Sequence, residues 1–190
     1  MCTQDRRFTA YHEAGHALIY SSLGYCIKSV TIDNTGNGRV NVHSLMPTTF
    51  YSDEKTLSNN MRDYAYKCLS GYSAEFKYRK MRERGIPQYT TSNSDENDFN
   101  RLWLEMWKAN ELLGRDRYNN WWLYFLYKET RKIIRGKQEW AAIEALANHI
   151  IQQGDLEVTG EVVDTIFEQH IKPDKLLVKL YSNKTAASFN

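Results

Sequence analysis

The pentapeptide His12-Glu13-Ala14-Gly15-His16 constrains this chain more than any other stretch of its sequence. Residues four apart return to the same face of an α-helix, so both imidazoles of this H-E-x-x-H pattern can reach one metal ion. The flanking residues are apolar, which predicts a buried helix, and a buried histidine pair without a partner is costly. We therefore expect His12 and His16 to bind a metal and Glu13, at the rim of that face, to accept a proton from water. The alternative is a pair of ordinary surface or core histidines.

Gly15 lies inside the same expected helix. A glycine there costs about 1 kcal/mol relative to alanine. It is tolerated where a neighbouring backbone or side chain must come very close, so we expect such an approach at Gly15.

A catalytic zinc usually has three protein ligands and one open position. The other histidines, His43, His149 and His170, do not extend the first motif, so a carboxylate is the better third ligand. Asp98 is the best candidate, because it is expected at a helix N-terminus, where the helix dipole favours a carboxylate. Asp95 is the alternative, and both acids are also explained as simple helix caps.

The whole chain has the composition of one globular domain, with 190 residues of which 42% are hydrophobic. We expect this domain to cover residues 1–172 and a loosely ordered tail to cover residues 173–190. The net charge of +2 is too small to predict a nucleic acid or membrane partner. No apolar run approaches the roughly 20 residues of a membrane-spanning helix.

The three cysteines, Cys2, Cys26 and Cys68, form no C-x-x-C pair. This predicts free thiols in a reducing compartment instead of a disulfide framework or a thiolate metal site. The N-terminus also leaves no room for a signal peptide ahead of the histidine helix. Together these features predict a cytoplasmic protein.

The hydrophobic periodicity predicts an α+β fold that is mostly α, with a small β-sheet after the histidine helix. The first helix is expected to be capped by Thr9 and to run to about Leu23, with Gly24 as its C-cap residue. We expect strands at 28–33 and 39–44 joined as a hairpin, and helices at 55–84 (interrupted near Gly71), 98–113, 119–135, 138–153 and 160–170. The five tryptophans are expected in the core.

These segments resemble the peptidase domain of the FtsH-type ATP-dependent zinc metalloproteases, in the family's order, over about residues 8–168. The most specific part is the H-E-A-G-H pentapeptide with its frame, residues 8–18. Residues 29–47 are similar to the family's strand pair, 69–76 to its L-A-G-R-A-A-E-E-L helix, 91–101 to its T-G-A-S-N-D-L-x-R-A run, and 156–162 to its L-D-G-E-E-I segment.

The chain also departs from the family's pattern. Tyr72 stands where the family has arginine, Phe76 replaces its second glutamate, and the stretch before Asp98 is two or three residues longer. No phosphate-binding G-x-x-x-x-G-K-[ST] loop is present, so we expect no ATP site in this chain.

The resemblance implies a zincin-like helical peptidase domain with one zinc ion held by His12, His16 and Asp98 and with Glu13 as general base. It implies an endopeptidase that cleaves extended or unfolded polypeptides without its own ATPase module. A separate ATPase or self-association stays open as a partner. The alternatives are a zinc-binding interaction or regulatory protein that keeps the peptidase fold without useful turnover, and a zinc hydrolase of non-peptide substrates.

Two further site predictions accompany this interpretation. The second strand, through Arg39, Val40, Asn41 and Val42, is expected to pair with extended substrate, although it could equally be a structural edge. Glu75 is expected to orient a ligand histidine or to serve as an alternative ligand, although it could equally make a structural hydrogen bond.

Overall fold

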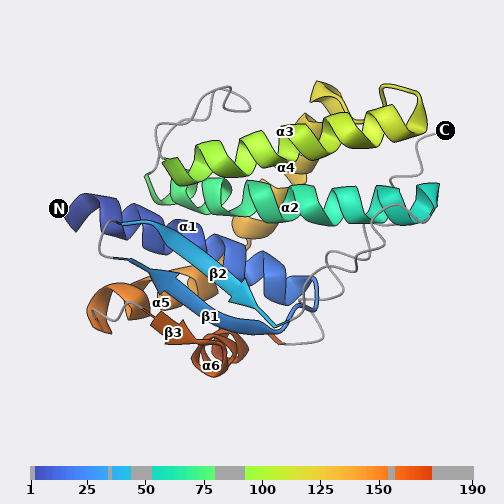
Figure 1. The fold of residues 1–190 in the computed structure, drawn as a ribbon. Coiled ribbons are helices and arrows are strands. Elements are labelled where there is room, and N and C mark those ends of the chain that lie inside the picture. The colour runs from blue at the N-terminus through green and yellow to red at the C-terminus, as the bar shows by residue number, and fades with distance from the viewer. Residues whose placement is uncertain (1–2, 34–35, 44–52, 80–92, 154–156, 173–190) are drawn as a thin grey trace.

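A central helix, α1 (Thr3–Ser22), organises the fold in the computed structural model, which describes residues 3–33, 36–43, 53–79, 93–153 and 157–172 (Figure 1). The remaining elements are β1 (Ile27–Ile32), β2 (Gly38–Val42), α2 (Glu54–Tyr78), α3 (Asn93–Leu113), α4 (Asn120–Ile134), α5 (Lys137–Gln153), β3 (Glu157–Thr159) and α6 (Gly160–His170). The chain is therefore mostly helical with a small antiparallel sheet, as the periodicity predicts.

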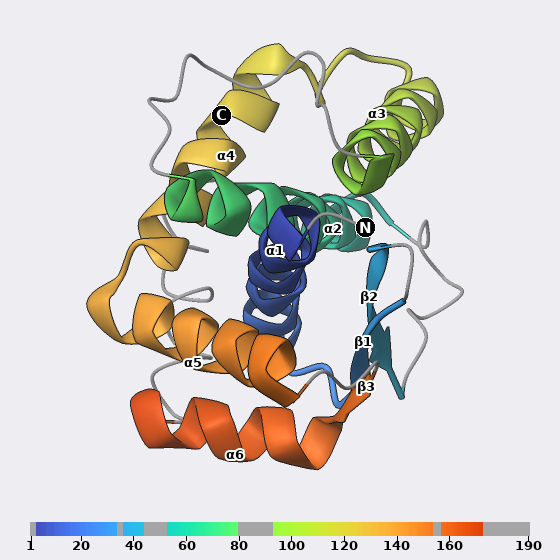
Figure 2. The same ribbon diagram turned by 90° about the vertical axis from the view of Figure 1, so that its left-hand side faces the viewer.

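Other elements surround α1 on three sides, as the end-on view in Figure 2 shows. Helix α2 packs along one side, α5 along another, and the hairpin of β1 and β2 along a third. Helices α3 and α4 pack on α2, and α6 packs on α5 and β1. This surrounding explains why residues 10–19 of α1 are buried on every face, with Ala10, Ala14 and Ala17 fully buried.

The sheet has the strand order β2-β1-β3, and both pairings are antiparallel. Among the described strands β2 pairs only with β1, so its outer edge carries free backbone groups. The Thr9 hydroxyl donates a hydrogen bond of 2.8 Å to the Gly36 carbonyl oxygen in the hairpin turn. This bond holds the start of β2 beside α1.

Three expected helix boundaries are wrong. Helix α1 begins at Thr3, so Thr9 lies in its interior and does not cap it. Helix α2 runs through Gly71 without interruption, because packing against α1 outweighs the low helix propensity of glycine. Helix α3 begins at Asn93 instead of Asp98. The expected C-cap is confirmed: Gly24 follows α1 with a positive φ of 81°.

The expectation that all five tryptophans lie in the core is also wrong. Trp103, Trp107 and Trp121 are 43%, 61% and 80% exposed, whereas Trp122 and Trp140 are partly buried against the core. Helix α3 packs on α2 through a face that includes Leu102 and Met106, and the two tryptophans beside that face remain in solvent.

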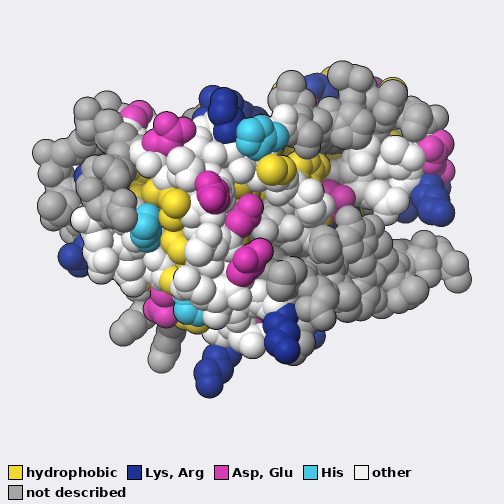
Figure 3. Space-filling view, turned by 90° about the horizontal axis from the view of Figure 1, so that it is seen from below, with side chains coloured by type: hydrophobic (Ala, Val, Ile, Leu, Met, Phe, Trp, Pro, Cys, Tyr) yellow, Lys and Arg dark blue, Asp and Glu magenta, His cyan; other side chains and the backbone are white. Residues whose placement is uncertain are grey.

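Within the described ranges, no helix combines the length and apolar character needed to cross a bilayer. The face formed by β3 and α6 gathers acidic side chains near its centre, with basic side chains toward its margins (Figure 3). Cys26 and Cys68 are free thiols, the first exposed and the second buried. Cys2 and the expected tail at 173–190 lie outside the described residues.

Candidate metal centre

His12 and His16 lie one turn apart on α1 and are almost completely buried, at 2% and 8% exposure. Their burial follows from the close packing of α1 on α2. A Cβ added at Gly15 would lie 2.7 Å from the Ser70 carbonyl oxygen and 2.6 Å from the Cβ of Ala74. The expectation that Gly15 permits a close approach is therefore confirmed, and this approach brings both imidazoles against α2.

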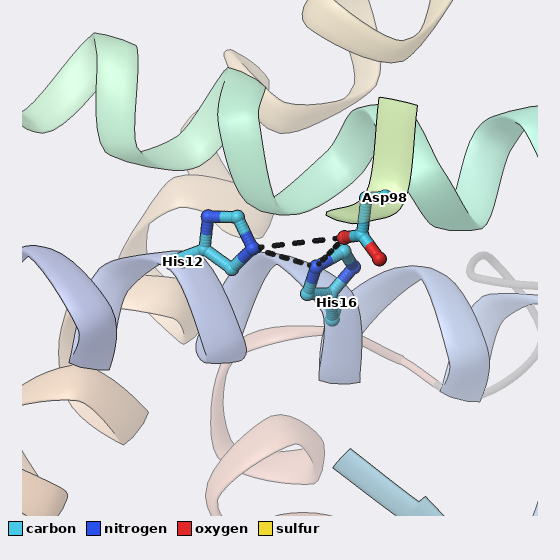
Figure 4. A group of neighbouring side chains, drawn as sticks. All are labelled: His12, His16 and Asp98. Atoms are coloured by element: carbon cyan, nitrogen blue, oxygen red, sulfur yellow. Dashed lines mark hydrogen bonds and ion pairs between the residues drawn. The ribbon is translucent and has the colours of Figure 1, made fainter. Parts of the chain in front are cut away.

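The ring nitrogens of the two histidines converge on one carboxylate, as Figure 4 shows. The Nε2 atoms of His12 and His16 are 2.9 Å apart. Asp98 on α3 places its Oδ2 2.9 Å from Nε2 of His16 and 3.8 Å from Nε2 of His12. Three residues that are far apart in the sequence thus meet within 4.8 Å of one another.

The contact of the second ring nitrogen of His16 shows which of its two nitrogens carries the proton. Nδ1 of His16 lies 2.8 Å from the carbonyl oxygen of Lys67, and a carbonyl can only accept, so Nδ1 carries the proton and donates. In the neutral imidazole Nε2 then presents a lone pair to His12 and Asp98. Three electron-pair donors face one another in a buried space, and this arrangement requires a cation between them, either protons or a metal ion.

Gly71 on α2 leaves room for such a cation. A Cβ at this position would lie 2.4 Å from Nε2 of His16 and 2.5 Å from Nε2 of His12. Any other residue would fill the gap between the two nitrogens. Two imidazoles, one carboxylate and an open side form the donor set of a catalytic zinc site, so the residues present fit that ion.

Asp98 reaches the cluster from the second turn of α3, not from the helix N-terminus that the sequence predicts. Burial raises the pKa of its carboxyl, but His16 and His12, when they carry a proton on Nε2, hold that pKa well below its usual range. Asp98 is therefore an anion that faces the histidines. Asp95 lies in the same helix, and its side chain lies outside the described residues.

Glu75 lies on the opposite side of His12 from Asp98. Its Oε2 is 3.4 Å from Nδ1 of His12, and its Oε1 pairs with Arg79. The pairing with Arg79 holds the Glu75 carboxylate beside His12, and a carboxylate at this nitrogen favours a proton on Nδ1 and a lone pair on Nε2 of His12. This placement suits the orienting role and not the alternative one as a ligand, since Glu75 contacts the nitrogen that faces away from the cluster.

Glu13 borders the cluster without joining it. The side chain is 3% exposed and packs against β2, where a Cβ at Gly38 would lie 2.4 Å from Oε1 of Glu13. A cleft of about 800 Å³ opens here. Glu13, His12, His16, Asp98 and the β2 residues 38–42 all line it.

The sequence matches no known protein family model and no curated protein. The resemblance to FtsH-type peptidases therefore rests on its motifs alone. The structure brings together His12, His16 and Asp98, places Glu13 beside them, and puts Glu75 behind His12.

Sequence reasoning missed two residues of α2 at this site. Gly71 was expected to interrupt a helix, whereas it leaves the space between the histidines. Lys67 was not considered at all, yet its carbonyl oxygen orients His16 and its side chain lines the cleft. The spacing Lys67–Gly71–Glu75, in which successive positions are four residues apart, is the signal that could have placed all three on one helix face.

Proposed function

We propose that this chain is a zinc-dependent endopeptidase with a zincin-like fold, related to the peptidase domain of the FtsH-type proteases. The observation that carries the proposal is the convergence of His12, His16 and Asp98 on a gap that Gly71 leaves open. The H-E-x-x-H motif, the buried Glu13 and the adjoining edge strand support the same conclusion.

In this proposal His12, His16 and Asp98 hold one zinc ion per chain. A bound zinc ion would supply Lewis acidity to a water molecule and to the scissile carbonyl. Glu75 and the Lys67 carbonyl oxygen act behind the ligands, where each lies beside the Nδ1 atom of one ligand imidazole and favours the tautomer with its proton on Nδ1.

Glu13 acts as the general base and then as the general acid. Its carboxylate accepts a proton from the attacking water and returns that proton to the leaving amine. The position supports this role, because Glu13 follows the ligand His12 directly and lines the cleft without belonging to the group of three ligand residues. Packing against Gly38 restricts the carboxylate to that place.

Strand β2 is the substrate-binding element in this proposal. Its outer edge offers free backbone groups, and Arg39, Val40, Asn41 and Val42 line the cleft beside Glu13. An extended polypeptide that adds to this edge gains main-chain hydrogen bonds irrespective of its side chains. This favours unfolded segments as substrates.

The test is cleavage of casein, a disordered protein, by the purified chain with and without a chelator. Glu13→Gln should retain zinc and the fold but lose cleavage, since glutamine is nearly isosteric and cannot take a proton. Glu157→Gln is the matched control, because Glu157 lines the same cleft from β3 and has no part in the proposed chemistry. Cleavage by Glu13→Gln at the parent's rate would remove the general-base role. A parent that binds zinc and cleaves nothing would favour a zinc-binding regulatory protein.

A further inference from the structure

A lysine side chain is buried in the cleft beside the metal centre. Lys67 on α2 is 5% exposed, and its Nζ donates to the Tyr25 hydroxyl at 3.2 Å. The faces of Tyr25, Tyr20 and Tyr64 surround the ammonium, with ring centroids 4.5, 5.5 and 5.9 Å from Nζ. No carboxylate within the described ranges lies at ion-pair distance from it.

Among the described residues, the contacts of this ammonium are with aromatic faces and a hydroxyl, which carry no charge. Aromatic faces stabilise a cation, but a buried charge without an anionic partner remains costly. The four-carbon stem could place the amine in solvent, yet the fold keeps it inside the cleft.

The position of Lys67 relates it to the proposed chemistry. Lys67 and Gly71 are four residues apart and share a face of α2, so their backbones are separated by about 6 Å along the helix. An extended peptide advances about 3.3 Å per residue. A carboxylate carried one or two residues from the scissile bond therefore falls within reach of the ammonium.

The charge distribution around the cleft favours the same kind of ligand. Apart from Glu13 and Asp98, its charged lining consists of one acid and several cations, namely Glu157 against Lys28, Arg39, Lys67 and Arg101. By contrast, the β3–α6 face is rich in acids (Figure 3). With Glu13 and Asp98 counted, the lining carries four cations against three acids, and this positive balance favours anionic ligands.

We propose that Lys67 is a specificity-determining residue, and that it binds a carboxylate of the polypeptide one or two residues from the scissile bond. The inference rests on the proposed peptidase function, because it places the carboxylate relative to a scissile bond. The carboxylate site itself can be measured by peptide binding alone. Two sources supply this chemistry, an aspartate or glutamate side chain and the terminal carboxylate of a chain.

The experiment measures binding of fluorescein-labelled peptides to zinc-loaded Glu13→Gln, which does not depend on turnover. One peptide carries an internal glutamate, a second carries glutamine in its place, and both end in an amide. A third has the glutamine sequence with a free C-terminal carboxylate. The glutamate or free-acid peptide should bind about tenfold or more tightly than the amidated glutamine peptide, the range for a hydrogen bond to a charged group. Equal binding of all three would overturn the inference.

Two substitutions then assign the preference to Lys67. Lys67→Met in the same background retains the apolar stem and the backbone carbonyl that orients His16, and it should remove the preference. Lys77→Met is the matched control, because Lys77 is also on α2, also lies over an aromatic ring (Trp140, 4.0 Å), and does not line the cleft. A preference that survives Lys67→Met, or that Lys77→Met also removes, would contradict the assignment.

The outcomes separate the two proposals. Selective binding of the acidic peptide together with no cleavage of any peptide by the parent would support the carboxylate site and remove the peptidase function. Cleavage of the glutamate and glutamine peptides at equal rates, with equal binding, would support the peptidase function and overturn the role of Lys67. If Lys67→Met fails to fold, the comparison of peptides on the intact side chain still decides whether a carboxylate site exists.

Discussion

Replacing Gly71 with alanine tests whether the gap between the two histidines is a metal site. The added Cβ would lie 2.4 and 2.5 Å from the two Nε2 atoms, closer than side-chain carbons pack against nitrogen without displacement. The rings must then move apart or the gap must fill, so the metal loses its place. Zinc affinity should fall by at least the roughly 10–100-fold that changes next to metal ligands cause.

The effect of Gly71→Ala on the metal-free protein is small because two terms oppose each other. Alanine gains about 1 kcal/mol in a helix interior relative to glycine. Overpacking costs about 1–3 kcal/mol, and here the atoms that must move are the ends of side chains and not backbone. The metal-free variant should therefore unfold within about 2 kcal/mol of the metal-free parent.

Thermal unfolding with and without zinc measures both effects. Zinc at a hundred times its dissociation constant stabilises the parent by about 2.7 kcal/mol, and for a chain of this length that raises Tm by about 5–10 °C. Gly71→Ala should lose most of this zinc-dependent rise. Gly15→Ala provides the contrast, because its Cβ meets the Ser70 carbonyl oxygen and should lower Tm even without metal. A full zinc-dependent rise in Gly71→Ala would refute the assignment of the gap.

Three other predictions concern neighbouring groups. Asp98→Ala should lose zinc on dialysis and Asp95→Ala should keep it; the reverse result would transfer the ligand role to Asp95. Glu75→Gln should weaken zinc binding about 10–100-fold, whereas Glu139→Gln, at a similarly buried acid outside the cleft, should not, and equal effects would contradict the orienting role. Burial lowers the pKa of Lys67 from the ordinary value of 10.5 to about 8, so between these pH values the unfolded chain binds more protons than the folded chain. The free energy of unfolding of the metal-free parent should therefore rise relative to that of Lys67→Met between pH 7.5 and 9.5. Denaturant titrations measure both, and a difference between the two proteins that is the same at both pH values would contradict this.

The parts of the fold that follow local rules could be predicted from the sequence. The hairpin of β1 and β2 follows from two apolar runs around a glycine-rich turn, and α4, α5 and α6 begin and end within about one residue of their expected bounds. His12 and His16 also follow from local spacing, because one helix turn is enough to bring them together.

The features that depend on distant contacts could not be predicted in this way. Strand β3 has only three residues and forms because β1 supplies its backbone partners. Asp98 reaches the histidines through the packing of α3 on α2, and the sequence places it at the wrong point of its helix. The exposure of Trp103 and Trp107 likewise depends on which helix α3 packs against, since a tryptophan at the margin of an apolar face can lie on either side of it.

Helix α2 meets the two histidines at three successive turns, through the Lys67 carbonyl oxygen, the missing Cβ of Gly71 and the Glu75 carboxylate. Each residue added to a helix turns everything beyond it by about 100°. One inserted or deleted residue between positions 67 and 75 would therefore move part of this set to another face while the helix itself survived. The chain cannot change in length within these two helical turns without losing this arrangement. Length variation among relatives should avoid this window even where side-chain identity varies.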